Sequence, residues 1–355
     1  MFQIVSLSLA VIGLSYMGVA ALRRWAEGHH ALDVPNERSS HDRPIPRAGG
    51  LAIVAITLVG IVVFWLHDPA WPLTAITTFI IGAGFIACVS LVDDLYGLSR
   101  NLRLFVHGLA AILVILGFGS WQTVSIPIVG ELHLGWLGLP ITFLWIVGLT
   151  NAYNFMDGID GLAGGQAVVA GSAWVLLGWV TDQFLVGGLG MLVAASSLGF
   201  LGHNWYPARI FMGDVGSAFL GYTFAVLSVI AAHHNPALAL SGVLILWPFV
   251  FDTTFTLLRR LYHGENILVA HRSHLYQRLL IVGHSHHFLS LLYVVLAVVG
   301  AGLAHIFTME VPGSAVLVGL LLPVLCLALW SYVVWEERKR TRQLRPQVPS
   351  LVDTL

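Results

Sequence analysis

Uncharged apolar segments, each about as long as a membrane-spanning helix, recur along the whole chain. Of its 355 residues, 57% are hydrophobic and only 10% are charged, whereas roughly a quarter of an ordinary soluble domain is charged. A helix needs about 20 apolar residues to cross the hydrocarbon core of a bilayer. The sequence predicts about eleven such spans, at 2–22, 49–66, 73–92, 104–118, 138–152, 163–181, 184–202, 216–232, 237–257, 288–307 and 313–335. We therefore predict an all-α polytopic membrane protein rather than a soluble helical core, with one transmembrane domain over 1–335 and a basic tail over 336–355.

The basic residues predict the orientation of these spans. No basic residue precedes the first apolar run and Arg23 and Arg24 follow it, which indicates a retained helix with its N-terminus outside rather than a signal peptide. The inner connections are then about 23–48, 93–103, 153–162, 203–215, 258–287 and 336–355. All 17 lysine and arginine residues lie in them, as the positive-inside rule requires. Among the outer connections, 119–137 contains two alternating stretches around Gly130, which predict a small β-hairpin near 121–135.

Acidic side chains gather at the predicted inner ends of the spans. They are Asp93 and Asp94 after the third span, Asp157 and Asp160 with Asn154 after the fifth, Asp214 before the eighth and Asp252 within the ninth. An aspartate in a spanning helix costs about 2.5–3.5 kcal/mol on insertion scales, so a group at one depth needs cations, partners or water. Helix capping could account for Asp214, but we expect it not to account for an adjacent pair at a helix C-terminus, where the helix dipole disfavours anions.

The chemistry of this acidic group favours a hard cation. Carboxylates with an amide and without cysteine suit Mg²⁺, which binds one or two carboxylates together with substrate phosphates. We expect Mn²⁺ to be able to replace it. The spacing of N-x-x-D-G-x-D-G excludes an EF-hand loop, which needs a closing glutamate. Glycines 158, 161, 164 and 165 would let backbone N–H groups approach a phosphate at the start of the sixth span.

Two basic inner loops complement the acids. The loop VPNERSSHDRPIPRAGG over 34–50 contains Arg38, His41, Arg43 and Arg47, and the prolines and Gly49–Gly50 favour an ordered position for Arg47. The loop over 259–279 contains His271, Arg272 and His274, of which the two histidines could share a helix face. We interpret His284, His286 and His287 as a polar turn. Acids that hold Mg²⁺ beside arginines and histidines predict phosphoryl transfer between a nucleotide-borne group and a lipid.

Four ordered motifs carry a family resemblance. VDDLYGL, NAYNFMDGIDGLAGG, FMGDVGSAFLGY and the HxxHL of HRSHLYQRL closely resemble the polyprenyl-phosphate N-acetylhexosamine-1-phosphate transferases, and DVPNERSSHDRPIPRAGG resembles that family's first inner loop. The resemblance covers about 33–287. It implies a multi-pass protein of the bacterial inner membrane with a periplasmic N-terminus and hairpin, a cytoplasmic C-terminus and a cytoplasmic active site.

The resemblance also implies an activity and roles for residues. Such an enzyme moves a sugar 1-phosphate from a UDP-N-acetylamino sugar to undecaprenyl phosphate, releases UMP and starts a lipid-linked surface polysaccharide. By this resemblance Asn154 and Asp214 bind Mg²⁺; Asp93 and Asp94 lie near the lipid phosphate; Asp157 and Asp160 lie on the nucleotide side; Arg47, Asp252, His271, Arg272 and His274 belong to the substrate site. It implies membrane lipid but no nucleic acid as a partner, and a homodimer as the family's assembly.

One motif departs from the family pattern and indicates which branch of the family the chain resembles. Two other classes of protein remain as alternatives. The family's run of consecutive histidines is broken here to His-Arg-Ser-His, which points away from the peptidoglycan branch towards O-antigen-type initiators. A secondary transporter would place its acids near the midplane and in inverted repeats. A CDP-alcohol phosphatidyltransferase would need a different spacing of acids than DGIDGLAGG provides. The sequence leaves the sugar open among GlcNAc, GalNAc, FucNAc and QuiNAc.

Overall fold

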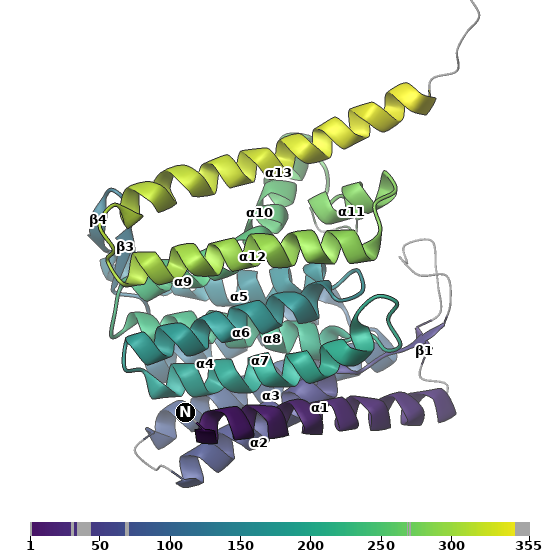
Figure 1. The fold of residues 1–355 in the computed structure, drawn as a ribbon. Helices are drawn as coiled ribbons and strands as arrows, with labels where there is room; N and C mark the ends of the chain where they lie inside the picture. The colour runs from purple at the N-terminus through teal and green to yellow at the C-terminus, as the bar shows by residue number, and fades with distance from the viewer. Residues whose placement is uncertain are drawn as a thin grey trace, which may run out of the picture.

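The computed structural model describes residues 2–29, 32–33, 44–67, 71–267, 269 and 271–344. Two antiparallel strand pairs accompany its helices (Figure 1). The elements are α1 (Phe2–Gly28), β1 (Leu32–Asp33), β2 (Ile45–Pro46), α2 (Gly50–His67), α3 (Leu73–Tyr96), α4 (Arg100–Phe118), β3 (Thr123–Ile126), β4 (Gly130–His133), a 3₁₀ turn (Gly135–Leu137), α5 (Gly138–Met156), α6 (Leu162–Val180), α7 (Phe184–Asn204), α8 (Asp214–Ala232), α9 (Ala237–Ile245), α10 (Trp247–Tyr262), α11 (Leu275–Ile281), α12 (His286–Thr308) and α13 (Ser314–Leu344).

The helices confirm an all-α polytopic membrane protein. Within the described residues, 10 helices are long and apolar enough to cross a membrane, and the bent pair α9–α10 accounts for one further span. The predicted hairpin is also present, with Thr123 paired to His133 and Ile126 to Gly130. It lies at one end of the helices, whereas α11 and the connections α5–α6 and α7–α8 lie at the opposite end (Figure 1). We call this opposite end, where α3 and α5 finish and α8 begins, the acidic end.

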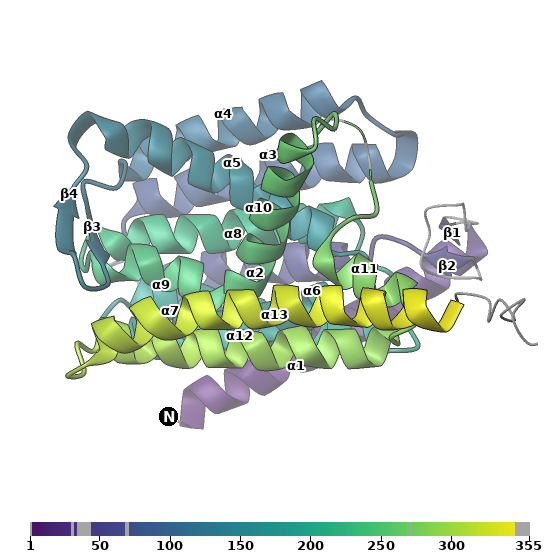
Figure 2. The same cartoon turned by 90° about the horizontal axis from the view of Figure 1, so that it is seen from above.

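The ninth predicted span is not one straight helix. The axes of α9 and α10 differ by 79°, and α10 runs across the direction of its neighbours (Figure 2). Pro248 lies at the start of α10, where a proline is tolerated because the first N–H groups of a helix have no partner within it. Trp247 donates its indole N–H to the Leu296 carbonyl at 2.8 Å and fixes the bend against α12.

Helix ends also differ from the prediction, and the difference bears on the site. The helix α4 begins at Arg100 and α5 ends at Met156, so Arg103 and Asn154 lie on helices rather than in loops. The last helix continues nine residues beyond the predicted domain boundary at 335, from Glu336 to Leu344.

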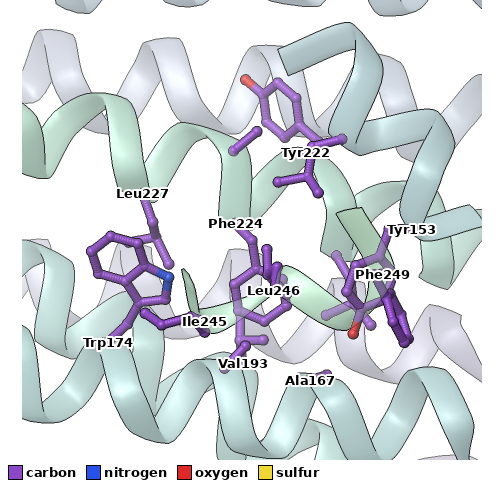
Figure 3. Packing of buried hydrophobic residues seen from close by; sticks show 14 of the residues in the cluster. Tyr153, Ala167, Trp174, Val193, Tyr222, Phe224, Leu227, Ile245, Leu246 and Phe249 are labelled. Carbon is purple, nitrogen blue, oxygen red and sulfur yellow. The ribbon is translucent and has the colours of Figure 1, made fainter. Parts of the chain in front are cut away.

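The core is centred on α8. The structure buries 94% of the apolar window of this helix, and Phe224 and Leu227 pack among Trp174, Tyr153 and Phe249 from α6, α5 and α10 (Figure 3). Close approach to α5 depends on Gly221, where an added Cβ would lie 2.8 Å from the Leu149 carbonyl oxygen. This packing fixes the start of α8 beside the end of α5, which positions the acidic residues.

Candidate active site

Asp94 caps a helix that is distant in the sequence. One carboxyl oxygen accepts the Asp214 N–H at 3.0 Å and the other accepts the Val215 N–H at 3.1 Å. The approach needs a glycine at position 213, because φ is +76° there and an added Cβ would lie 2.7 Å from Asp94 Oδ2. The expectation that capping could not account for the aspartate pair is therefore wrong for Asp94: it lies at the C-terminus of α3 but at the N-terminus of α8, where the dipole favours an anion.

Arg103 joins the two halves of the acidic group. Its Nη1 donates to Asp93 Oδ2 at 2.6 Å and to Asp214 Oδ2 at 3.0 Å. Asp93 Oδ1 also accepts the Leu98 N–H at 2.6 Å. The sequence analysis counted Arg103 only among the basic residues of the inner connections. Ser99 could have indicated its position, because serine is a favoured N-cap residue. Ser99 accepts the Leu102 N–H and so places Arg103 in the first turn of α4, facing the aspartates.

Asn154 and Asp214 meet, although 60 residues separate them in the sequence. Ser217, one turn into α8, donates its hydroxyl to Asn154 Oδ1 at 2.7 Å, and the Asn154 side chain lies within hydrogen-bond reach of the Asp214 carboxylate. The last turn of α5 and the first turn of α8 thus bring an amide and a carboxylate oxygen together.

Asp157 adds a further carboxyl group to the same region. It follows α5 directly as its C-cap. Burial, and then the carboxylates of Asp214, Asp94 and Asp160, raise the pKa of Asp157 to about 8. Burial is the main cause of this shift and the neighbouring carboxylates add to it, so the Asp157 carboxyl group is mostly protonated at neutral pH.

Asp160 has different partners from the other acids. Its Oδ2 accepts the Ala208 N–H at 2.9 Å, its Oδ1 lies 3.3 Å from His286 Nδ1, and its carbonyl accepts the Ser290 hydroxyl at 2.6 Å. Asp160 therefore ties the α7–α8 connection to the start of α12. His286, predicted to belong to a polar turn, is the first residue of α12, and its ring pairs with this carboxyl group.

Close packing requires two of the glycines that follow α5. An added Cβ at Gly158 would lie 2.0 Å from the Tyr276 hydroxyl, and one at Gly161, where φ is +75°, would lie 2.8 Å from Trp205. Gly161 donates its N–H to the Asn204 side chain at 3.0 Å. The expected approach of a phosphate to the backbone here stays a prediction.

Asp252 is enclosed and organises the histidine-bearing loop. Its side chain is 0% exposed, and its two oxygens accept hydrogen bonds from the Leu275 N–H at 2.8 Å and the Tyr276 N–H at 3.1 Å. It also contacts the His274 ring at 3.2 Å, the Tyr293 hydroxyl at 2.7 Å and the Thr256 hydroxyl at 3.3 Å. Asp252 thus holds the start of α11, and its side chain has no surface left for a substrate.

His271 and His274 lie together without sharing a helix face. His274 is the N-cap of α11 and His271 precedes it in the loop, with their ring centroids 5.0 Å apart. Burial, followed by the charges of His274 and Arg260, lowers the pKa of His271 to about 4, so its ring is neutral at neutral pH. Arg272 lies half-buried between them.

Arg47 lies in an ordered segment, as expected. It pairs with Asp33 across the β1–β2 ribbon. The residues after it bind the segment before α8: Gly49 donates its N–H to the Phe211 carbonyl and Gly50 to the Met212 carbonyl, both at 2.9 Å. Arg38, His41 and Arg43 lie outside the described residues.

A cavity of about 830 Å³ opens beside the acidic group. Its polar lining includes Arg100, Arg103, Asn154, Asp214, His271 and His274. Its apolar lining comes from α4, α5 and α10 and includes Leu104, Leu144, Phe155 and Leu257, which are between 37% and 66% exposed on the membrane-facing surface. The cavity can therefore admit a molecule with an anionic head and an apolar chain.

The residues present fit a hard divalent cation. Within the described part of the chain, no three or more His, Cys, Asp or Glu side chains are grouped to hold a metal ion by themselves. The Asn154 and Asp214 side chains are neighbours beside further carboxyl groups, and Mg²⁺ takes few protein ligands because phosphates and water complete its shell.

Comparisons with known proteins agree with this geometry. A model of glycosyl transferase family 4 matches residues 75–232. A probable undecaprenyl-phosphate N-acetylglucosaminyl 1-phosphate transferase of Bacillus subtilis is 38% identical over 259 residues, which cover 72% of this chain and 71% of that protein. The chain belongs to glycosyl transferase family 4.

Further relatives in family 4 come from two branches. A decaprenyl-phosphate N-acetylglucosaminephosphotransferase of Mycolicibacterium smegmatis is 30% identical over 355 residues, covering 89% of this chain and 86% of that protein. A phospho-N-acetylmuramoyl-pentapeptide-transferase of Halalkalibacterium halodurans is 29% identical over 255 residues, covering 68% and 78%. The family 4 match runs from α3 to the end of α8 and so contains Asp93, Asn154 and Asp214, whereas Asp252 and the histidine loop lie beyond it.

Proposed function

We propose that this protein transfers an N-acetylamino-sugar 1-phosphate from a UDP-sugar to undecaprenyl phosphate, releases UMP and starts a lipid-linked surface polysaccharide of the O-antigen type. The convergence of the ends of α3, α5 and α8 on one acidic group beside a cavity with an apolar wall carries this proposal. The activities of the relatives make N-acetylglucosamine the first sugar to test.

The cavity suggests where each substrate would lie. The polyprenyl chain would run along Leu104, Leu144 and Leu257, with its phosphate towards Arg100 and Arg103. The diphosphate of the sugar nucleotide would lie towards Asn154, Asp214 and the neutral ring of His271. In this arrangement the acidic end faces the cytoplasm of a bacterial inner membrane, where all 17 basic residues would also lie.

The transfer is a direct displacement in this proposal. An oxygen of the lipid phosphate forms a bond to the β-phosphorus, the bond from that phosphorus to the bridging oxygen breaks, and UMP leaves with the electron pair. A phosphate monoester has a second pKa near 6 and is mostly dianionic at neutral pH, so a general base would add little. Asp94 binds two backbone N–H groups and Asp93 binds Leu98 and Arg103, which suits positioning rather than proton transfer.

Charge neutralisation is the remaining requirement of phosphoryl transfer. Mg²⁺ held by Asn154 and Asp214, when bound, would neutralise charge on the diphosphate. Arg103 already neutralises part of the charge of Asp93 and Asp214. Isolation of an aspartyl-phosphate intermediate would overturn the direct displacement.

The experiment uses the purified full-length chain in lipid or detergent with Mg²⁺, undecaprenyl phosphate and a panel of radiolabelled UDP-sugars: GlcNAc, GalNAc, FucNAc and QuiNAc. We expect one UDP-sugar to give UMP together with a labelled lipid, and chelation to stop both. No UMP with any sugar would refute the transferase. Substrate flux without UMP would favour the transporter instead.

A further inference from the structure

The charged end of α13 forms an ion pair with the short helix α11. Arg278 of α11 donates from Nε to Glu337 Oε1 at 2.8 Å and from Nη2 to Oε2 at 2.6 Å. The Arg278 side chain is 12% exposed and that of Glu337 is 36% exposed. A two-bond fork of this kind fixes orientation as well as distance, so the contact holds α11 more firmly than a single surface ion pair would.

Two further contacts join α13 to the turn after α11. Arg340 donates to the Ile281 carbonyl at 2.6 Å. His284 lies 3.8 Å from Glu336 and 3.4 Å from the Tyr332 hydroxyl. Residues of α13 between Tyr332 and Arg340 therefore contact the second half of α11 and the turn that follows it.

The other side of α11 faces the candidate active site. Its first two N–H groups bind Asp252, and its N-cap is His274, which lines the cavity. Tyr276 donates its hydroxyl to the Phe155 carbonyl at 3.2 Å, one residue from Asn154. A shift of α11 would therefore move the histidine loop and the last turn of α5 together.

We propose that Arg278 and Glu337 are a positioning pair for phosphoryl transfer, through which the end of α13 holds α11 in register with the acidic group. This inference rests on the proposed function. Neither side chain touches the cavity, so the pair would act on substrates only through His274 and through the α5 turn beside Asn154. Because reacting groups must be placed to within about 1 Å, loss of the pair should lower turnover more than binding.

The test compares single variants with a charge-reversed pair in the full-length protein. We expect Glu337→Gln to lower kcat about tenfold, with the KM for undecaprenyl phosphate and the thermal midpoint unchanged. The double variant R278E/E337R should regain most of the lost turnover because it restores the fork with reversed charges. The matched control is Arg338→Gln, which removes a charge from the exposed neighbouring position and should keep wild-type kcat.

A second measurement does not depend on turnover. Hydrogen–deuterium exchange of the backbone amides of residues 276–282 should be faster in Glu337→Gln than in the wild type and unchanged in Arg338→Gln. Wild-type kcat and wild-type exchange in Glu337→Gln would overturn the positioning pair while leaving the proposed function intact. If the wild-type protein releases no UMP, the proposed function fails, and unchanged exchange would then also refute the mechanical link. A loss of kcat that the charge-reversed pair does not restore would count against the pair as well.

Discussion

Asp94 and Asp252 do the same structural work in two different surroundings. Each uses its two carboxyl oxygens to accept the first two backbone N–H groups of a helix that lies elsewhere in the sequence, α8 for Asp94 and α11 for Asp252. Asp252 gains three side-chain partners from Thr256, His274 and Tyr293 and is fully buried. Asp94 instead has the carboxyl groups of Asp157 and Asp214 around it.

The difference in partners indicates that Asp252 has a structural role and that Asp94 belongs to the candidate active site. Around Asp252 the polar contacts are complete within the protein, so the group can hold α11 in place without any ligand. Around Asp94 the carboxyl groups of Asp93, Asp157 and Asp214 lie close together with Arg103, and such a cluster gains stability when a cation binds to it. The same capping geometry thus gives a closed anchor at one helix and an open, charged site at the other.

The largest expected effect comes from removing the charge of Asp214 at the open site. Asp214→Asn should lower turnover about 10²–10³-fold, the size seen when one preorganised charge-stabilising group is lost, because Asn154 would lose its anionic partner. Folding should be retained, since Asp94 caps α8 through the backbone of residue 214. UMP release and the thermal midpoint are the measurements. Turnover at the wild-type level would remove Asp214 from the site.

The next effect separates the two aspartates directly. Asp252→Asn should lower the free energy of unfolding by about 3 kcal/mol, because the amide can no longer accept at both atoms and a buried donor loses its partner. Asp94→Asn should lose less free energy of unfolding than Asp252→Asn does, but it should lower turnover because it changes the charge next to Asp214. Chemical denaturation and UMP release are measured on both variants. Equal losses of stability in the two would contradict the division between anchor and site.

The sequence predicted most of the fold because span length and charge asymmetry are local properties. It also predicted the residues of the acidic end, since aspartates stand out in apolar surroundings. The family resemblance placed Asn154 and Asp214 together, but nothing in the sequence predicted the ion pairs: Arg103 contacts Asp214 across 111 positions and Arg278 contacts Glu337 across 59. Those pairs, like the bend before Pro248, follow from packing around α8 and α11, which no local pattern encodes.

A smaller effect tests how closely Asp94 must approach α8. Gly213→Ala places a Cβ 2.7 Å from Asp94 Oδ2 at a φ of +76°, so we expect a loss of about 2 kcal/mol of folding stability together with reduced turnover. Gly313 is the matched control, because its φ is +83° and the space for a Cβ is open. Gly313→Ala should lose about 1 kcal/mol and keep its turnover. The free energy of unfolding and the turnover are measured for both variants. Equal losses in the two variants would show that crowding against Asp94 has no consequence.

The last prediction concerns the protonation of Asp157 at the open site. A folded-state pKa of about 8 for Asp157, above its ordinary value of 3.8, means that the folded protein keeps a proton that the unfolded chain has already lost. Folding stability should therefore fall as pH rises from about 4 to about 8, by at most about 1.4 kcal/mol per pH unit.

His271 acts in the opposite direction but in a different pH range. Its pKa, lowered from 6.5 to about 4, makes folding stability rise with pH up to about 6.5 and contributes no slope above that value. Unfolding measured with chelator between pH 6.5 and 8 therefore excludes the contribution of His271: the wild type should lose stability across this range, and Asp157→Asn should lose less. Added Mg²⁺ should flatten the wild-type curve, because a cation beside the carboxylates favours their ionised form. Parallel curves for the two proteins without Mg²⁺ would mean that the charge around Asp94 is already balanced, as it is around Asp252.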